Sequence, residues 1–310
     1  MLNRIKAVMF GHAVGDALGV PVEFRSREYL EKNPVKDMMG YGTHNVPAGT
    51  WSDDTSMSLC ALSSLLNGNV DYDDIMKNFV KWSYDGEFTT DGAVFDIGNT
   101  CSNAIDNYFY SGKPAKKCGL TNERSNGNGS LMRIHPFVLY AYYNGINDNK
   151  EFVDMIASAS SLTHANKCSI DGCVIYAYVL RELLNNPEKS SVYKGIDYAK
   201  YVRPFGRHYD RLFDDNIDTL SSADIKSSGY VVYSLEAAIW CLLTTNSYEE
   251  CVLKAVNLGE DTDTVAAIAG SLAGALYGVD AIPASWIGKL RKKEYIEEMC
   301  NKACAAWKAD

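Results

Sequence analysis

The feature that most constrains the fold is a helical spacing of apolar residues that recurs along almost the whole chain. From Thr55 the chain is mostly apolar until it reaches Asn67-Gly68, a helix-ending pair. The same three- and four-residue steps, broken by Gly, Asn or Pro, recur in segments 72–83, 99–110, 131–144, 151–162, 168–185, 231–244, 248–257, 263–278 and 293–307. Alternating strand patterns are scarce, and no repeat or linker divides the chain. The sequence therefore predicts an all-α fold in a single compact multi-helix domain spanning residues 1–310.

Small residues mark the first predicted helix, where Gly11, Gly15 and Gly19 lie four apart. Because such a ridge lets another backbone approach closely, we expect this helix to be tightly packed. The helices leave three loops, 85–98, 119–130 and the polar stretch 185–229, and long loops in a helical protein commonly carry function. Within the third loop, residues 207–218 are charged enough to form a solvated surface helix.

The charge balance restricts the partners of the chain. Its 310 residues include 30 Lys and Arg and 39 Asp and Glu, a formal net charge of −9, whereas nucleic-acid binders carry a basic stripe. The longest apolar stretch, Val265 to Tyr277, is shorter than the roughly 20 residues that span a bilayer, and His12 and Asp16 interrupt the N-terminal apolar run. We expect a cytoplasmic protein that does not bind a membrane, with its nine cysteines reduced.

Two acidic clusters stand immediately before apolar helices, 52–55 (SDDT) and 261–264 (DTDT). Capping of backbone N–H groups alone can explain either cluster. A cap uses one side chain, however, and four carboxylates gathered at one point repel strongly without a cation. If the two helix starts meet, their oxygen donors favour Mg²⁺, Mn²⁺ or Ca²⁺ over zinc or copper, and the number of carboxylates favours two ions. The two clusters lie some two hundred residues apart in the sequence, which permits them to meet in the fold but does not show that they do.

Other enzyme classes lose support because their motifs are missing. The chain has no GxxxxGK[ST] phosphate loop, no HExxH, no GxSxG elbow and no EF-hand ligand ladder. The segment 127–129 (GNG) is similar to the start of a dinucleotide fingerprint, but Arg133 follows where glycine spacing should continue and no strand precedes it.

Seven motifs, in one order over most of the chain, resemble those of the ADP-ribosylglycohydrolase family. They are GHAVGDALGVPVEF (11–24), GTWSDDTSM (49–57), FDIGN (95–99), SNGNGSLMRIHP (125–136), THANKCSIDGC (163–173), GYVVYSLEAAIWC (229–241) and NLGEDTDTVAAIAGSLAGALYG (257–278). The resemblance implies an all-α single-domain fold with a dinuclear centre of two Mg²⁺ or Mn²⁺ ions. It also implies cleavage of the bond that joins ADP-ribose to an acceptor.

Carried over onto this chain, the resemblance implies a set of metal ligands: Ser52, Asp53, Asp54, Asp261, Asp263 and Thr264. Ser52 departs from the family's usual Thr, which keeps the hydroxyl but loosens its rotamer. Glu260 stands where the family tends to have Gly or Asp, and it adds a carboxylate beside the centre. Neither change removes a ligand type.

Three carboxylates are implied as catalytic groups, namely Asp54, Asp96 and Glu23. Glu23 resembles the family's glutamate that approaches and gates the metal centre, whereas the alternative is a surface carboxylate at a helix end. Asp96 resembles a loop aspartate that faces the scissile ribose, although Asp is also common as a turn residue. The glycine-rich stretch from Gly92 to Gly98 favours a loop that faces the substrate.

The remaining substrate-binding residues are also implied by the resemblance. Asn128, Gly129 and Ser130 resemble a loop and helix start that bind the diphosphate, for which free backbone N–H groups are suited. His164 resembles a histidine near the diphosphate or distal ribose, and Tyr230 resembles an aromatic that stacks on adenine. A lone His is often a packed residue, and 20 tyrosines make any single one weak evidence. Arg133, inside an apolar helix, is as often a buried anchor as a phosphate ligand. No role is assigned to the other histidines, His12, His44, His135 and His208.

The expected reaction is hydrolysis of an N- or O-glycosidic bond between ADP-ribose and an arginine or serine side chain, with two ions orienting the ribose and activating water. A catalytically silent ADP-ribose-binding protein and a two-metal nucleotide phosphohydrolase stay open as alternatives. We expect a monomer that acts on an ADP-ribosylated protein or small molecule, and we expect nucleic acid only as an ADP-ribosylated acceptor.

Overall fold

The structure, a computed structural model, describes residues 1–214 and 216–307. Within these ranges the regular elements are helices, and β-structure is limited to isolated bridges. The α-helices are α1 (Leu2–Gly19), α2 (Arg27–Lys32), α3 (Asp53–Leu65), α4 (Tyr72–Asp85), α5 (Asn99–Phe109), α6 (His135–Tyr143), α7 (Asn149–Ser161), α8 (Lys167–Asn185), α9 (Ser190–Val202), α10 (Asp210–Asp214), α11 (Val231–Leu243), α12 (Tyr248–Val256), α13 (Thr262–Tyr277), α14 (Ala284–Lys289) and α15 (Lys293–Ala306). Their buried apolar side chains form one core, so the all-α prediction is confirmed.

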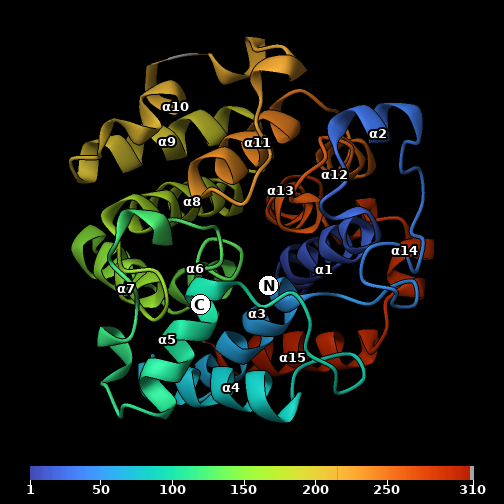
Figure 1. Ribbon diagram of the computed structural model, residues 1–310. Helices are drawn as coiled ribbons and strands as arrows, with labels where there is room; N and C mark the ends of the chain where they lie inside the picture. The colour runs from blue at the N-terminus through green and yellow to red at the C-terminus, as the bar shows by residue number, and fades with distance from the viewer. Residues whose placement is uncertain (215, 308–310) are drawn as a thin grey trace.

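Helices α1 and α13 lie side by side and antiparallel at the centre of the molecule (Figure 1). Their backbones touch, because a Cβ added to Gly11 would lie 2.4 Å from the carbonyl oxygen of Gly270 and one on Gly15 would lie 2.1 Å from that of Ala266. The glycine ridge read from the sequence is therefore the contact face of α1, and its partner is the helix that follows the second acidic cluster.

The first helix and the turn that follows it form a long apolar segment. Residues 2–22 are long and apolar enough to cross a membrane by length and composition, yet 94% of the apolar 18-residue stretch within them is buried inside the fold. Helices α13 and α15 pack against it. Its hydrophobicity is thus explained by its place in the core.

Three parts of the chain differ from the sequence prediction. The stretch 185–229, expected as a polar loop, contains α9 and the short α10, and α9 buries Val192, Ile196 and Ala199 against the rest of the fold. These three apolar residues recur at helical spacing, but the polar residues between them hid the pattern. Of the predicted surface helix 207–218, residues 207–214 form one 3-10 turn and α10, and residue 215 lies outside the described residues. The helix expected from 131 begins only at His135, because turns occupy the residues before it.

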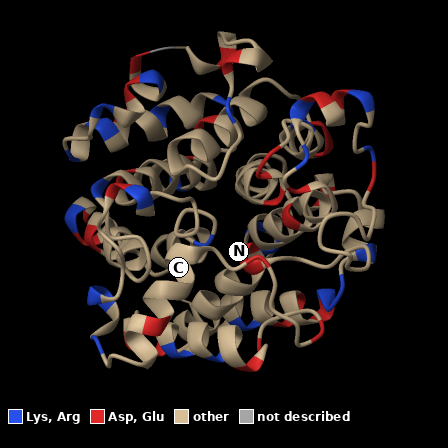
Figure 2. Ribbon diagram, viewed as in Figure 1, with Lys and Arg blue, Asp and Glu red and all other residues tan. Residues whose placement is uncertain are grey.

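The pairing of α1 with α13 decides where the acidic clusters lie. The C-terminal end of α1 meets the N-terminal end of α13, where the Thr262 hydroxyl donates a hydrogen bond to the Gly19 carbonyl at 2.8 Å. On the outer helices, acidic and basic segments are interspersed, whereas acidic segments lie at the starts of α3 and α13 (Figure 2). The fold therefore places these acidic helix starts in its interior.

Candidate active site

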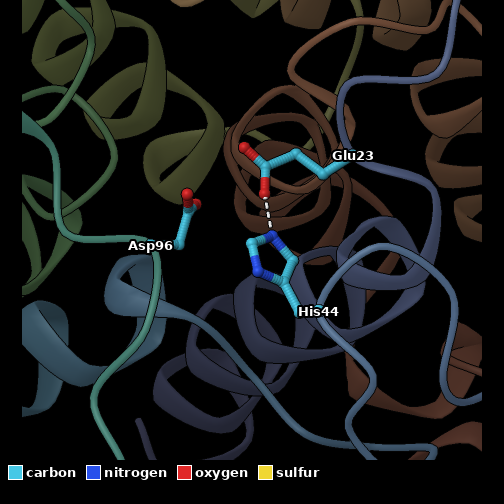
Figure 3. A group of neighbouring side chains, drawn as sticks. All are labelled: Glu23, His44 and Asp96. Carbon is cyan, nitrogen blue, oxygen red and sulfur yellow. Dashed lines mark hydrogen bonds and ion pairs between the residues drawn. The ribbon is translucent and has the colours of Figure 1, made fainter.

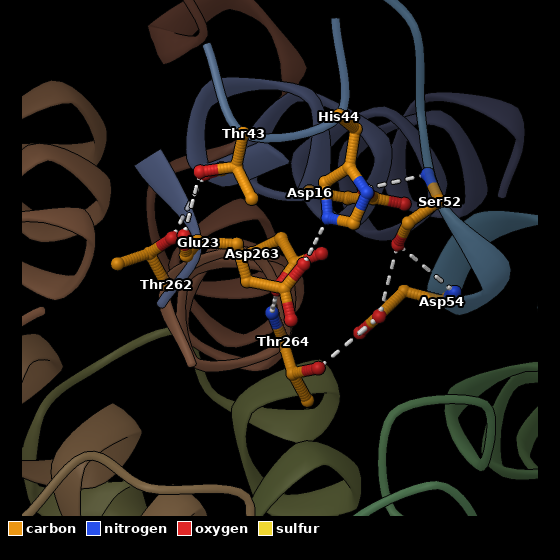
Figure 4. Close-up of polar contacts among 10 residues, drawn as sticks. Asp16, Glu23, Thr43, His44, Ser52, Asp54, Thr262, Asp263 and Thr264 are labelled. Atoms are coloured by element: carbon orange, nitrogen blue, oxygen red, sulfur yellow. Dashed lines mark hydrogen bonds and ion pairs between the residues drawn. The ribbon is translucent and has the colours of Figure 1, made fainter. Parts of the chain in front are cut away.

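The two acidic clusters meet. Helix α3 begins at Asp53 and α13 begins at Thr262, and the Thr264 hydroxyl donates a hydrogen bond to Asp54 Oδ2 at 3.2 Å (Figure 4). The Ser52 hydroxyl donates to the same oxygen at 3.1 Å. The sequence alone does not show whether the two clusters meet. In the fold they do, because segments about two hundred residues apart share one oxygen-rich site.

A buried aspartate on α1 holds the first cluster in place. Asp16 is fully buried and accepts three hydrogen bonds, from the backbone N–H groups of Ser52 (2.9 Å) and Thr55 (3.0 Å) and from the Thr55 hydroxyl (2.6 Å). Burial raises the pKa of Asp16 to about 6, while these donors oppose the rise. Asp16 is not among the site residues predicted from the sequence, where its only signal is its place in the GHAVGDALG segment of the first motif.

The second cluster is completed by a residue from the loop after α1. Glu23, Asp261 and Asp263 each place a carboxylate oxygen within 4.8 Å of the others. Asn128 Nδ2 donates to Asp261 Oδ2 at 2.7 Å and to Ser234 Oγ at 2.9 Å, so its amide orients a cluster carboxylate.

The electrostatics of this site call for a cation. Burial, reinforced by the neighbouring carboxylates, raises the pKa of Asp53, Asp54 and Asp263 well above the usual range, and burial also raises the pKa of Asp261. Asp54 Oδ1 and Asp263 Oδ2 are buried atoms without a hydrogen-bond partner. Buried polar oxygens are rarely left unpaired, and hard oxygen donors suit Mg²⁺ or Mn²⁺. The residues present therefore fit a divalent metal centre.

Three side chains from separate loops gather beside this centre (Figure 3). His44 Nε2 hydrogen-bonds Glu23 Oε2 at 2.5 Å, and ligand atoms of Glu23, His44 and Asp96 all lie within 4.8 Å of one another. Burial, followed by the charge of Asp261, raises the pKa of Glu23 to about 8, and burial, followed by the charge of Glu23, raises that of Asp96 to about 8. Leaving His44 without a role was wrong in structural terms, because this histidine is the hydrogen-bond partner of Glu23.

A cavity of about 400 Å³ opens above the acidic centre. Glu23, Asp53, Asp96 and Asp261 form its acidic end, and the loop 127–129 and His164 also line it. Burial lowers the pKa of His164 to about 3, with the charge of Arg133 adding to the effect, so this ring is neutral near pH 7. Among the residues found to line the cavity, Arg124 is the one side chain with a positive charge at that pH.

The other substrate-binding candidates differ in how they lie relative to the cavity. Ser130 is fully buried and bonded to Ser160, Gly92 lies outside the residues found to line the cavity, and Tyr230 lies next to the lining residue Gly229. No helix begins at Ser130, and the Asn128 N–H already donates to the Gly229 carbonyl at 3.0 Å. The expectation of a helix start at this point is therefore wrong, whereas the loop that it also named does line the cavity.

Arg133 is a buried anchor. Its guanidinium is fully buried, and it donates to the Ala159 carbonyl at 3.1 Å and to Thr163 Oγ1 at 2.8 Å. Since it also lies 4.9 Å from the Phe79 ring centroid, its charge is held inside the protein behind the cavity wall.

Comparison with known proteins decides the family. The ADP-ribosylglycohydrolase profile matches residues 1–310. The chain belongs to the ADP-ribosylglycohydrolase family. It is 33% identical over 302 residues to an ADP-ribosylarginine hydrolase Tri1 of Serratia proteamaculans, covering 97% of this chain and 79% of the relative. It is 29% identical to the ADP-ribosyl-[dinitrogen reductase] glycohydrolase of Rhodospirillum rubrum, covering 94% and 91%.

A solved structure described as an ADP-ribosylglycohydrolase-related protein complex supports the same assignment. It matches with a TM-score of 0.83 and 30% identity, covering 98% of both chains. As a member of this family the chain is an enzyme, a hydrolase of glycosidic bonds of ADP-ribose. The resemblance seen in the seven motifs is confirmed.

Proposed function

We propose that the protein is a metal-dependent hydrolase that removes ADP-ribose from modified arginine side chains, with two Mg²⁺ or Mn²⁺ ions in the acidic centre. One observation carries the metal part of the proposal, namely the convergence of two helix starts on buried carboxylates whose atoms Asp54 Oδ1 and Asp263 Oδ2 lack partners. The names of the relatives support arginine as the acceptor. The monomeric state and the cytoplasmic location stay predictions.

The reaction joins a water oxygen to the anomeric carbon of the ribose as the bond from that carbon to the guanidine nitrogen breaks. The electron pair of the broken bond passes to the nitrogen, and one proton of the water follows it, so the products are ADP-ribose and arginine. When bound, the divalent ions supply Lewis-acid polarisation and a template for the ribose hydroxyls.

The side chains of this site supply proton transfer and charge stabilisation. Glu23 and Asp96, each with a pKa raised to about 8, can hold a proton near neutral pH and exchange it with water or the departing nitrogen. With divalent ions bound, Asp53 and Asp54 would be ionised and would stabilise the positive charge that develops on the ribose in the transition state. His44 fixes Glu23 Oε2 through its hydrogen bond.

The metal site is tested by Asp263→Ala, with Asp280→Ala as the matched control at the exposed end beyond the same helix. Purified protein with Mg²⁺ or Mn²⁺ should release ADP-ribose from an ADP-ribosylarginine peptide. The Asp263 variant should lose release and calorimetric metal binding together, whereas the Asp280 variant should keep both. Full activity in a chelator-treated sample would overturn the metal dependence.

The two alternatives give different products. A catalytically silent reader would bind ADP-ribose tightly without turnover, and a nucleotide phosphohydrolase would release phosphate or AMP. Mass spectrometry that detects intact ADP-ribose, released faster from the arginine peptide than from a serine peptide or O-acetyl-ADP-ribose, supports the proposed reaction and acceptor.

A further inference from the structure

One aromatic side chain, that of Phe24, is exposed to solvent at the acidic end of the cavity. Phe24 follows Glu23 directly and lines the cavity, yet 67% of its surface is exposed. A large apolar side chain at a pocket mouth leaves its ring face available for a ligand. Neither the burial of the core nor the acidic centre needs this ring.

The backbone holds Phe24 there in an uncommon conformation. Its φ is +64°, in the left-handed region that bulky residues rarely adopt. Phe24 N–H donates to the Glu260 carbonyl at 2.7 Å, and Glu260, itself at φ +62°, donates its N–H to the Arg25 carbonyl at 2.8 Å. The loops that carry Glu23 and Asp261 are thus tied together through Phe24, and such strain persists where the surrounding structure enforces it, commonly at a functional site.

The position of the ring identifies what it faces. Its centroid lies 6.0 Å from that of His44, the residue bonded to Glu23, so the ring stands beside the carboxylates at the reaction end. Arg124 lines the cavity together with the loop 127–129 and His164, the segments that the family motifs relate to the diphosphate. With the diphosphate bound at Arg124 and the loop 127–129, the acceptor on the other side of the reacting ribose would come next to Glu23 and the adjoining Phe24.

We propose that Phe24 recognises the acceptor by stacking its ring on the arginine guanidinium. This inference rests on the proposed function and adds the residue that selects the acceptor. A guanidinium is a flat, weakly hydrated cation that stacks on aromatic faces, whereas a serine oxygen or an acetyl ester presents no such cation. Glu23 and Asp96 line the same cavity, and their side-chain oxygens can accept hydrogen bonds from the guanidinium N–H groups.

The test compares two substrates that share ADP-ribose and differ in the acceptor, an ADP-ribosylarginine peptide and O-acetyl-ADP-ribose. Phe24→Ala should lower kcat/KM for the arginine peptide by about 3- to 30-fold, the range of a cation–π contact, and leave binding of free ADP-ribose unchanged. Phe24→Tyr and Phe24→Trp should keep the preference. Tyr41→Ala is the matched control, because Tyr41 is 61% exposed at φ +66° and is not among the residues found to line the cavity.

Each outcome is decisive. An equal fall for both substrates, or weaker binding of free ADP-ribose, would place the ring on the ADP-ribose portion and overturn the inference. If wild-type protein cleaves neither substrate, the proposed function fails. The placement of Phe24 is then decided by calorimetry, where unchanged binding of the arginine peptide by Phe24→Ala would overturn it and weakened binding, with free ADP-ribose unaffected, would support it.

Discussion

At the scale of single residues, the cavity shows a charge imbalance that one side chain must offset. Its lining contains the carboxylates Glu23, Asp53, Asp96 and Asp261, whereas Arg124 is the one cation found among the lining residues. The diphosphate of ADP-ribose carries negative charge, and an arginine can bind a phosphate through two N–H groups at once. No sequence motif marks Arg124, whereas Arg133, which lies within one, is buried away from solvent.

Arg124→Gln should therefore raise the KM for an ADP-ribosylarginine peptide by about tenfold, the effect of losing one charge-assisted hydrogen bond, with a smaller change in kcat. Arg124→Lys should show a smaller rise in KM, because lysine keeps the positive charge but lacks the two parallel N–H donors of the guanidinium. Steady-state kinetics at two salt concentrations measures both effects. An identical KM in wild type and Arg124→Gln would show that the diphosphate binds elsewhere.

At the scale of elements, the site depends on how three helices meet. The motifs and the caps predicted most helices to within a few residues, because apolar spacing and Asp or Ser caps are local signals. The meeting of α3 with α13 could not be predicted. The glycine ridge of α1 indicates that another helix packs closely against α1, but it does not indicate which helix. His44 was assigned no role for a similar reason. Its hydrogen bond to Glu23 joins two loops, and no local sequence pattern encodes the contact between them.

Asp16 links α1 to the start of α3, so changing it should affect the site without contact with the substrate. Asp16→Asn replaces one acceptor oxygen with an NH₂ group that faces donors from Ser52 or Thr55. We expect metal affinity to fall by about 10- to 100-fold, the usual effect of losing a residue that orients metal ligands. Calorimetric titration with Mn²⁺ measures the affinity, and circular dichroism checks the fold. Unchanged affinity in a folded variant would contradict this role.

The contact between α1 and α13 should tolerate no added side chain. In Gly15→Ala the new Cβ would lie 2.1 Å from the Ala266 carbonyl oxygen, so the helices must separate. The expected loss is about 1–3 kcal/mol or more of unfolding free energy. Gly288→Ala on α14 is the control, because no atom lies within 4 Å of its added Cβ. Equal unfolding midpoints in urea for both variants would contradict the contact.

At the scale of the whole molecule, the acidic centre couples stability to pH and metal. The pKa of Glu23 rises from 4.5 to about 8 and that of Asp96 from 3.8 to about 8 on folding. Between these values the folded protein keeps protons that the unfolded chain releases, so these groups favour folding at low pH, and this contribution is lost as pH rises toward 8. In the proposed metal centre, divalent cations would bind the deprotonated carboxylates and take the place of those protons.

Addition of Mg²⁺ or Mn²⁺ should accordingly raise Tm more at pH 8 than at pH 5.5, and metal binding at pH 7 should release protons. Differential scanning calorimetry at both pH values measures the first effect, and titration in buffers of different ionisation enthalpy measures the second. Asp263→Ala should abolish the metal-dependent rise in Tm at both pH values. A larger metal-dependent rise in Tm at pH 5.5 than at pH 8 in the wild type would contradict the expected direction of this pH dependence.

The antiparallel contact of α1 with α13 has a consequence for how the enzyme is inactivated. The loop with Glu23 leaves the end of α1, and the loop with Asp261 precedes α13, so the distance between the two carboxylates is set by backbone contact in the deepest part of the core. Local opening at the surface does not alter that distance. Catalysis and hydrogen-exchange protection of the α1 amides should therefore be lost together on heating, so activity would serve as a direct assay of the folded fraction.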